Sequence, residues 1–408
     1  MNIMKILQLT NKVPYPPRDG GAIATLALTE GLAAQGHQVT VLAMNTTKHH
    51  TDVSQSPSPK WRLISAPVNT RIKPLSALFN LLFSRLPYNG VRFRSAKYRE
   101  ILISLLRKTP FDIIIIENLY PALYLKEIRS HSRARIMLRS HNLEHEIWLR
   151  NRDNTRGFKK WYLNILAQRI KRFEIRMVQS CDALIPITER DALKFKQLGN
   201  RLPTFILPAG LDEERLGHPS DSSGKITLAY LGALDWLPNQ SGIKWFLDKI
   251  WPSLIRNYPD LEFHIAGRNA PARFIRQLHH KGVIYHGEIR DAGTFIKAHP
   301  ITLVPLFAGS GMRIKILENM AAGRVVITTP VGCEGIPAVD GKHLFICSDS
   351  GSWINRIRQL ISQPGIIPAV GENAITFVRE KYLNKILITQ FSRFLTEWSN
   401  DSNHHILV

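Results

Sequence analysis

Short apolar runs alternate with amphipathic stretches along most of the chain. In the first half, runs at 3–9, 38–43, 112–116, 135–138 and 182–186 predict strands, and residues 22–34 show the periodicity of a helix. The run 112–116 contains four consecutive isoleucines, which is typical of a strand buried on both faces of a parallel sheet. The pattern therefore predicts a βαβ opening of an α/β domain.

The second half repeats this alternation from a new start. Strands are expected at 226–231, 262–266, 283–286, 301–306 and 343–347, separated by helices, and the chain closes with a helical region at 369–398. A further strand is expected at 205–208, and the polar run 212–224 is expected to connect two domains. At 408 residues the chain exceeds the usual size of a single core. We expect two doubly wound sheets.

A glycine-bearing loop between a strand and a helix is the strongest candidate for chemistry. Gly309-Ser310-Gly311 turns the chain after the strand at 301–306, and a helix is expected at 312–322. Backbone N–H groups at a helix N-terminus favour a phosphate, and Arg313 and Lys315 would strengthen that site. Glu318 lies about one helical turn past Lys315, where its carboxylate can accept hydrogen bonds from a ribose. The stretch predicts a sugar-nucleotide site.

The first half offers a glycine pair and a histidine at strand ends. Gly20-Gly21 would let a ligand approach the backbone closely, or would act only as a hinge. The Gly-x-Gly-x-x-Gly fingerprint is absent, so a nicotinamide cofactor is not expected. His141 follows the strand at 135–138 and fits a substrate contact or a structural cap. With Glu144 and His145 it also spells the inverted zincin signature, which would need a third ligand and a mid-helix position, so no metal site is expected.

Composition points to anionic partners. There are 54 Lys and Arg against 32 Asp and Glu, a formal net charge of +22. Basic residues alternate with large apolar ones at 71–108 and 150–176, a pattern that suits an anionic membrane surface, although a solvated basic face would look the same. No nucleic-acid motif accompanies them, and nucleic acid is not expected as a partner. The three scattered cysteines suggest a reducing compartment, and neither a membrane span nor a signal peptide is predicted, so we expect a cytoplasmic, membrane-peripheral protein.

These features together resemble the family-four glycosyltransferases of the GT-B fold, most specifically across 306–336. The resemblance implies two Rossmann-like doubly wound domains that face across a cleft. Residues 1–205 would bind the acceptor, 206–384 would bind the nucleotide sugar, and 385–408 would form a terminal helix that crosses back onto the first domain. It also implies transfer with retention of anomeric configuration, usually without a metal or other cofactor. Position by position, Gly20 and Gly21 match the glycines near the diphosphate, His141 the contact to the donor sugar, and Glu318 the ribose ligand.

The sequence departs from the family pattern at three places. Ser310 stands where the family usually has a first glutamate, Ala233 stands at the position of a phosphate-binding arginine, and Pro238-Asn239 lie near that of a lysine. Arg313 and Lys315 would then neutralise the diphosphate as catalytic residues, with Ser310 and Gly311 in the binding loop. The chain resembles a subgroup with Gly-Ser-Gly-x-Arg-x-Lys-x-x-Glu and Asp-Trp-x-Pro-Asn.

The sequence therefore predicts a retaining, hexosyltransferase-type glycosyltransferase. Its donor would be a nucleoside-diphosphate sugar and its acceptor a glycan or lipid-linked glycan in surface polysaccharide assembly. Two alternatives stay open at this point. One is a sugar-nucleotide epimerase or phosphorylase on the same scaffold, and the other is a non-catalytic protein that binds anionic surfaces or nucleic acid through charge alone.

Overall fold

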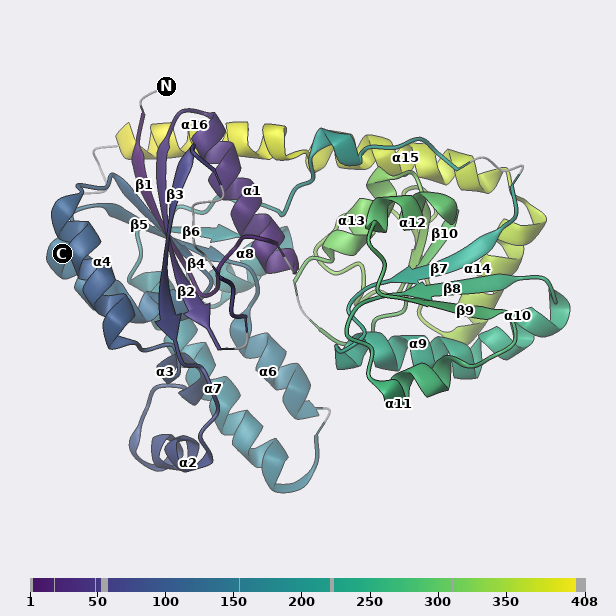
Figure 1. The fold of residues 1–408 in the computed structure, drawn as a ribbon, viewed down its shortest axis with the longest axis horizontal. Helices are drawn as coiled ribbons and strands as arrows, with labels where there is room; N and C mark the ends of the chain where they lie inside the picture. The colour runs from purple at the N-terminus through teal and green to yellow at the C-terminus, as the bar shows by residue number, and fades with distance from the viewer. Residues whose placement is uncertain are drawn as a thin grey trace. The chain divides into compact units, whose positions relative to one another are not determined.

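The computed structural model describes residues 3–17, 19–47, 49–52, 58–153, 155–220, 224–309 and 311–400. Contacts divide the chain into two compact units. Unit 1 contains the residues up to Gly210 together with the C-terminal helix from Asn384, and unit 2 contains Leu211–Leu383. Figure 1 shows the elements of each unit.

Unit 1 is built on a six-stranded parallel sheet with the order β3-β2-β1-β4-β5-β6 among the described residues. Its strands are β1 Lys5–Thr10, β2 Gln38–Thr46, β3 Trp61–Val68, β4 Ile113–Glu117, β5 Arg135–Ser140 and β6 Ala183–Pro186. Its α-helices are α1 Gly20–Ala34, α2 Pro74–Phe83, α3 Tyr88–Val91, α4 Ala96–Lys108, α5 Leu125–His131, α6 Glu144–Asp153, α7 Gly157–Gln179, α8 Glu189–Gln197 and α16 Asn384–Asn400, and a 3-10 turn spans Tyr120–Tyr124.

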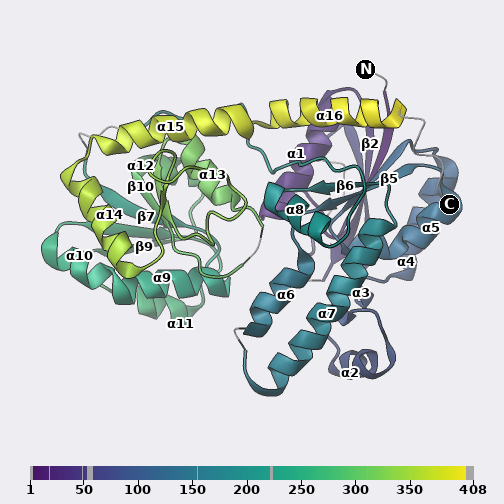
Figure 2. The same ribbon diagram turned by 180° about the vertical axis from the view of Figure 1, so that it is seen from behind.

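Side chains that alternate along the strands of unit 1 supply two hydrophobic layers. Leu7 and Leu9 of β1 pack with α4 and α5 on one face, whereas Ile6 packs on the other face with α1 and α16. In both ribbon views α1 and α16 lie side by side (Figures 1 and 2). Their close approach depends on Gly31, because a Cβ there would lie 2.7 Å from Ile388. The last helix of the chain is thus part of the core of the first unit.

Unit 2 repeats the architecture with a six-stranded sheet of order β12-β11-β10-β7-β8-β9, again parallel. Its strands are β7 Thr227–Leu231, β8 Glu262–Ala266, β9 Val283–Gly287, β10 Ile301–Val304, β11 Val325–Thr328 and β12 Phe345–Ile346. Its α-helices are α9 Leu237–Lys249, α10 Trp251–Asn257, α11 Ala272–Ile275, α12 Ala292–Ala298, α13 Ile314–Ala321, α14 Ser350–Ser362 and α15 Ile366–Lys381, with 3-10 turns at Glu213–Arg215 and Arg276–Leu278. Helices α9, α10 and α14 bury aromatic residues against one face, and α12 packs on the other.

The order of the strands identifies one edge of each sheet as the natural ligand site. In unit 1 the chain builds outward from β1 through β3 and then from β4 through β6, so the winding direction reverses between β1 and β4. In unit 2 the reversal lies between β7 and β10. Ligands of doubly wound sheets bind beyond the carboxyl ends of the strands at such a switch point. The prediction of two Rossmann-like doubly wound units is confirmed.

Two local predictions fail for physical reasons. No strand was expected at Trp61–Val68, yet β3 forms there as an edge strand whose outer side tolerates Pro67. Conversely, residues 205–208 form no strand, although the N–H groups of Phe205 and Leu207 donate to carbonyls of β6. Flanking Pro203 and Pro208 lack the N–H groups that a longer ladder requires.

A histidine cluster in unit 2 makes its stability depend on pH. His299 accepts or donates a 2.9 Å hydrogen bond with Thr227, and its ring centroid lies 4.2 Å from that of His264, which bonds His286 and Glu262. Burial, and then the neighbouring His264 and His286, lower the pKa of His299 to about 4, although Glu262 acts in the opposite direction.

Acidification from pH 6.5 to pH 4 should therefore destabilise unit 2. In that window the unfolded chain binds a proton at this histidine and the folded unit does not, so the free energy of unfolding falls as pH falls. We expect a loss of about 1–2 kcal/mol, less than the full shift implies because water screens part of the cluster. Urea unfolding at both pH values measures it. A His299→Gln variant should lose less stability than the wild type over the same interval, and equal losses would contradict the assignment.

Candidate functional site

The loop after β10 is shaped by two glycines at the switch point of unit 2. Gly309 and Gly311 adopt φ angles of 117° and 79°, in the left-handed region that side chains disfavour. A Cβ at Gly309 would lie 2.4 Å from the Arg313 guanidinium and 2.9 Å from the Trp236 ring. Ser310, predicted to belong to the binding loop, lies outside the described residues. The glycines thus allow the backbone to pass close to the Arg313 side chain.

Arg313 stands at the N-terminus of α13 and faces an aromatic side chain. Its guanidinium carbon lies 5.6 Å from the centre of the Trp236 ring, which belongs to the loop after β7. Arg313 is also the N-cap residue of α13, and its side chain does not cap the helix. The Ile316 N–H donates to the Arg313 carbonyl at 2.8 Å. Within the described residues this leaves the N–H groups of Ile314 and Lys315 at this end, where the helix dipole favours an anion.

Lys315 reaches the same point from the first turn of α13. Its Nζ donates to the Tyr230 hydroxyl at 3.1 Å and to Asn239 Oδ1 at 3.2 Å, and it would lie 3.4 Å from a Cβ at Gly232. Burial, together with the positive charge of Arg313, lowers the pKa of Lys315 to about 7. The ammonium group therefore occupies the end of β7 with neutral partners.

The Asp-Trp-x-Pro-Asn motif explains why Lys315 is held there. Asn239 is buried in the first turn of α9, and its Nδ2 donates to the Ala233 carbonyl at 2.7 Å while its Oδ1 accepts from Lys315. One amide side chain thus fixes both the loop after β7 and the cation. The sequence placed these residues in a subgroup motif without assigning Asn239 this role.

Glu318 lies one turn further along α13, on the same side of the helix as Lys315. Ile314, Leu317 and Ala321 form the buried side, so Glu318 stays partly accessible. Burial raises the pKa of its carboxyl group, and the positive charge of Arg215 acts in the opposite direction. Within the described part of the chain its side chain makes no hydrogen bond or ion pair, which leaves both oxygens available to a ligand.

In unit 1 the glycine pair lies in the first turn of α1 rather than in a loop. Asp19 caps this helix by accepting from Ala22 N at 3.0 Å, and it also pairs with Lys12 at 2.5 Å. A Cβ at Gly21 would lie 3.3 Å from Lys12 Nζ and 3.5 Å from His141 Nδ1. Gly20 and Gly21 thus bring a helix N-terminus, a lysine and the predicted histidine together at the switch point of unit 1.

His141 is buried and held by a glutamate from the neighbouring strand. Its Nε2 lies 2.5 Å from Oε2 of Glu117, the last residue of β4. Burial lowers the pKa of His141 despite this carboxylate, so the imidazole is neutral near pH 7. Burial alone would raise the pKa of Glu117, but the charge of Arg139, followed by the hydrogen bonds from His141 and Gln8, lowers it to about 2.

The remaining members of the zincin-like motif belong to a separate hydrogen-bonded group. His145 Nδ1 lies 2.5 Å from Glu174 of α7, and the same carboxylate accepts from the Glu144 N–H at 2.8 Å. Burial and the charge of Glu174 raise the pKa of the Glu144 side chain to about 7. Glu174 therefore fastens the first turn of α6 to α7. Within the described residues no group of three or more His, Cys, Asp or Glu side chains has the geometry of a metal site.

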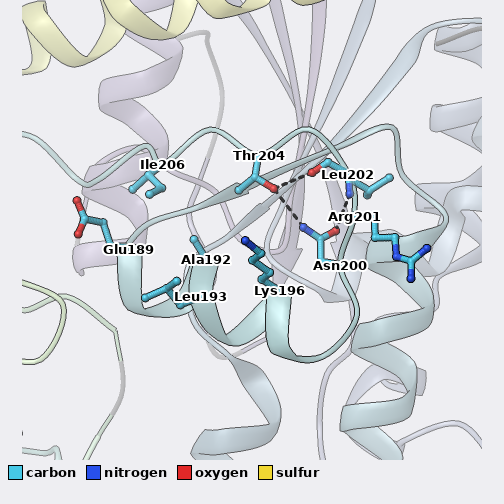
Figure 3. A pocket seen from close by; sticks show the side chains of 9 residues that line it. All are labelled: Glu189, Ala192, Leu193, Lys196, Asn200, Arg201, Leu202, Thr204 and Ile206. Atoms are coloured by element: carbon cyan, nitrogen blue, oxygen red, sulfur yellow. Dashed lines mark hydrogen bonds between the residues drawn. The ribbon is translucent and has the colours of Figure 1, made fainter. Parts of the chain in front are cut away.

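A pocket of about 500 Å³ lies elsewhere on unit 1 (Figure 3). It is lined by α8 and the segment that follows, where Thr204 accepts from Asn200 at 3.1 Å and donates to the Leu202 carbonyl at 2.9 Å. None of the predicted site residues lines it. Each unit thus has its own group of candidate residues, at the strand ends beside its switch point.

Comparison with known proteins agrees with this geometry. Residues 18–215 match the family model described as Glycosyltransferase Family 4, and residues 225–363 match the one described as Glycosyl transferases group 1. The chain belongs to the family-four, group-1 glycosyltransferases. The prediction of the family is thereby confirmed, whereas the motif subgroup stays a prediction.

Among curated proteins, the glycosyltransferase is 25% identical over 397 residues to the "Uncharacterized 44.6 kDa protein in cps region" of Klebsiella pneumoniae. The match covers 93% of this chain and 97% of the relative. Among solved structures, sucrose-phosphate synthase from Thermosynechococcus elongatus aligns with a TM-score of 0.73 at 16% identity, over 97% of this chain and 99% of that one. HepE from Anabaena, in complex with UDP and glucose, aligns with a TM-score of 0.66 at 13% identity, over 96% and 99%. These structures share its fold.

Several residues of the glycosyltransferase site were not predicted from sequence. They are Lys12, Glu117, Arg139 and Asn239. Trp236 could be interpreted from sequence either as a packing residue or, because it follows a strand, as one that lines a cleft. The charged pair could have been found from two signals: Glu117 follows a run of four isoleucines at the end of β4, and Arg139 is the penultimate residue of the neighbouring strand β5. Opposite charges at adjacent, otherwise apolar strand ends favour a buried ion pair.

Proposed function

We propose that this glycosyltransferase transfers a hexose-type sugar, with retention, from a nucleoside-diphosphate donor. The observation that carries the proposal is the arrangement at the β7/β10 switch point. Arg313, Lys315 and the uncapped N-terminus of α13 gather positive charge, and the Glu318 carboxylate lies one turn away. A bound nucleoside diphosphate would place its phosphates next to the cations and the helix N-terminus, and its ribose hydroxyls would donate to the Glu318 carboxylate. HepE, which shares the fold, was solved with UDP and glucose.

In the proposed reaction the bond between the anomeric carbon and the β-phosphate oxygen breaks. The acceptor hydroxyl forms a new bond to the same face of that carbon, and its proton passes to the departing β-phosphate. Negative charge develops on the diphosphate as the bond breaks, so Arg313 and Lys315 would stabilise the transition state more than the ground state. Because these cations and the helix terminus supply positive charge, we propose transfer without a metal, which activity in excess chelator tests.

His141 and the glycine pair would serve the sugar in this scheme. A neutral imidazole beside the N-terminus of α1 offers a hydrogen bond to a sugar hydroxyl, and Gly21 leaves room for a ligand beside Lys12. These roles follow the family resemblance. The acceptor would be a glycan or lipid-linked glycan in surface polysaccharide assembly, a proposal that the relative from a cps region supports.

We further propose that the glycosyltransferase works on the cytoplasmic face of an anionic membrane. Helix α2 buries none of its residues, and all its large apolar side chains except the half-buried Leu81 are between 54% and 82% exposed. With the preceding Ile72 they form what we call the α2 platform: Ile72, Leu75, Leu78, Phe79, Leu82 and Phe83. Phe158 and Trp161 of α7 are exposed as well, and both ribbon views show α2 beside α7 (Figures 1 and 2).

The α2 platform is anchored in the fold although its apolar side chains are exposed. Arg169 of α7 donates to the Asn80 and Leu81 carbonyls at 3.0 and 2.8 Å, and the Tyr88 hydroxyl bonds both the N–H and the carbonyl of Lys73. The helix is therefore fixed at both ends. An exposed apolar surface of this kind requires a partner.

Charge around the α2 platform selects an anionic bilayer as that partner. Residues 71–99 contain seven Lys and Arg and no Asp or Glu, and residues 154–173 contain six and none. Apolar side chains surrounded by basic ones match the interface of an anionic membrane. No helix in the part of the chain that the structure describes is long and apolar enough to cross a membrane.

A ligand panel tests the proposed activity. The melting temperature of the protein should rise with one nucleoside diphosphate and its sugar, since a ligand at 100 times its Kd adds about 2.7 kcal/mol to stability. Free nucleoside diphosphate should be released only when an acceptor is present, and NMR of the product should show the anomeric configuration of the donor. Release without an acceptor would favour the epimerase or phosphorylase alternative.

Glu318→Ala is expected to remove the thermal shift that the preferred nucleotide causes. The variant should fold normally, because within the described residues the side chain makes no hydrogen bond or ion pair that its loss would break, and donor KM should rise at least 10-fold. A wild-type thermal shift in Glu318→Ala would contradict the ribose assignment.

A further inference from the structure

Glu117 is the centre of a buried polar network that includes other donors besides His141. Its carboxylate is fully buried and faces four donors. Oε1 accepts from Gln8 Nε2 at 2.7 Å and lies 3.4 Å from Arg139 Nη1, and Oε2 lies 2.5 Å from His141 Nε2 and 3.4 Å from the Thr25 hydroxyl. These donors come from β1, α1, β5 and the turn after β5, so one carboxylate joins every element at the switch point of unit 1.

Arg139 supplies the charge that keeps this carboxylate ionised. It is 1% exposed, and Nη1 also donates to the Ala24 carbonyl of α1 at 2.9 Å. A buried carboxylate with a guanidinium partner is an anion, and an anion can only accept hydrogen bonds. Glu117 therefore requires a proton on His141 Nε2.

The other ring nitrogen faces the ligand side. His141 Nδ1 points to the glycine turn of α1, 3.5 Å from an ideal Cβ at Gly21. In a neutral imidazole only one nitrogen carries a proton, so Nδ1 holds a lone pair when Nε2–H donates to Glu117. His141 is then an acceptor towards its ligand.

We propose that Glu117, charge-paired with Arg139, is a positioning residue that fixes the tautomer of His141 and presents Nδ1 as a hydrogen-bond acceptor to a substrate hydroxyl. The inference deepens the proposed function and rests on it for the identity of the hydroxyl. The orientation and tautomer of the ring depend only on the network. A sugar hydroxyl suits this site because it is neutral and can donate a hydrogen bond to Nδ1 without bringing a charge next to the buried imidazole.

The substitution Glu117→Gln makes an unusual prediction. Arg139 can only donate, so the new amide oxygen must stay on the Arg139 side and the NH₂ group must turn to His141. His141 then has to accept at Nε2 and carry its proton on Nδ1. The variant should reverse the tautomer, convert the acceptor into a donor, and lower kcat 10- to 100-fold.

Nitrogen-15 NMR of labelled protein reads the tautomer without any substrate. The wild type should show His141 protonated at Nε2, with the signal assigned by its absence in His141→Gln. His145 is an internal control, since it faces Glu174 through Nδ1 and should be protonated at Nδ1 in both proteins. Glu117→Gln should exchange the two His141 nitrogen shifts and leave those of His145 unchanged.

Two results would overturn the proposal. One is wild-type His141 protonated at Nδ1, a result that does not depend on whether any Glu117 variant folds. The other is an unchanged His141 tautomer in Glu117→Gln. If that variant does not fold, Glu117→Asp keeps the anion and should keep the Nε2–H tautomer with reduced turnover; a reversed tautomer there would also count against it. Absence of sugar transfer with the expected tautomers would instead refute the proposed function alone.

Discussion

Replacing Arg313 with alanine should lower the turnover of the sugar donor by about 100-fold, equivalent to about 2.7 kcal/mol of transition-state stabilisation. The guanidinium lies at the N-terminus of α13 and is packed over Trp236, where the departing diphosphate is proposed to bind. Because charge on the leaving group grows as the bond breaks, kcat should fall more than KM rises. Steady-state kinetics with the preferred donor measures both.

Two further variants make this result specific. Arg313→Lys keeps a charge but loses the planar group that lies over Trp236, so its turnover should fall between those of alanine and wild type. Arg290→Ala removes an exposed arginine of the same unit and should leave kinetics unchanged. The melting temperature should stay within a few degrees for all three. Near-normal turnover of Arg313→Ala would refute the phosphate assignment.

Replacing three side chains of the α2 platform with serine should release the glycosyltransferase from anionic vesicles. Leu75, Phe79 and Phe83 are 82%, 69% and 73% exposed, so the substitutions remove apolar contact with a bilayer and almost none with the protein. Each large side chain buried in lipid contributes about 1.5–3 kcal/mol. The triple variant should therefore lose at least 100-fold in vesicle partitioning, as measured by co-sedimentation, with little change in stability.

Matched surface leucines provide the control for the α2 platform. Leu193 of α8 and Leu237 of α9 are 61% and 70% exposed, and a Leu193→Ser/Leu237→Ser variant should bind vesicles like the wild type. Binding of the wild type should weaken with salt and with neutral lipid, because the basic residues contribute electrostatically. Dimerisation of the wild type that the triple variant abolishes, without vesicle binding, would assign the platform to a second copy of the chain instead.

The periodicity of the sequence was sufficient to predict most strands of the two sheets, because strands such as β4, β6, β10 and β11 are buried along their whole length. The isoleucine run before Glu117 shows this clearly, since every residue of β4 is buried. Edge strand β3 was not predicted because it pairs only with β2, and because buried, intermediate and exposed residues follow one another along it without regular alternation. The winding order and the switch points follow from long-range pairing, which no local pattern reports.

The residues of the candidate site also divide into those that local sequence spacing predicts and those that depend on long-range contacts. Arg313, Lys315 and Glu318 are close in sequence, so helical spacing alone predicts that Lys315 and Glu318 share one side of α13. The contacts of Lys315 with Tyr230 and Asn239 join residues more than 70 positions apart, and those of Glu117 join β1, α1 and β5. Such contacts arise only when the strands pair, and this is why the supporting residues were missed.

Helix α16 has a consequence for how the protein is made. Phe391 and Leu395 are fully buried in the same layer as Ile6 and Val41 of β1 and β2, so strands that are synthesised early share one core with a helix that is synthesised after the whole of unit 2. Domains usually fold in order of synthesis. Unit 2 can complete its core before α16 has been synthesised, whereas unit 1 must wait, with an apolar sheet face uncovered, until α16 emerges from the ribosome.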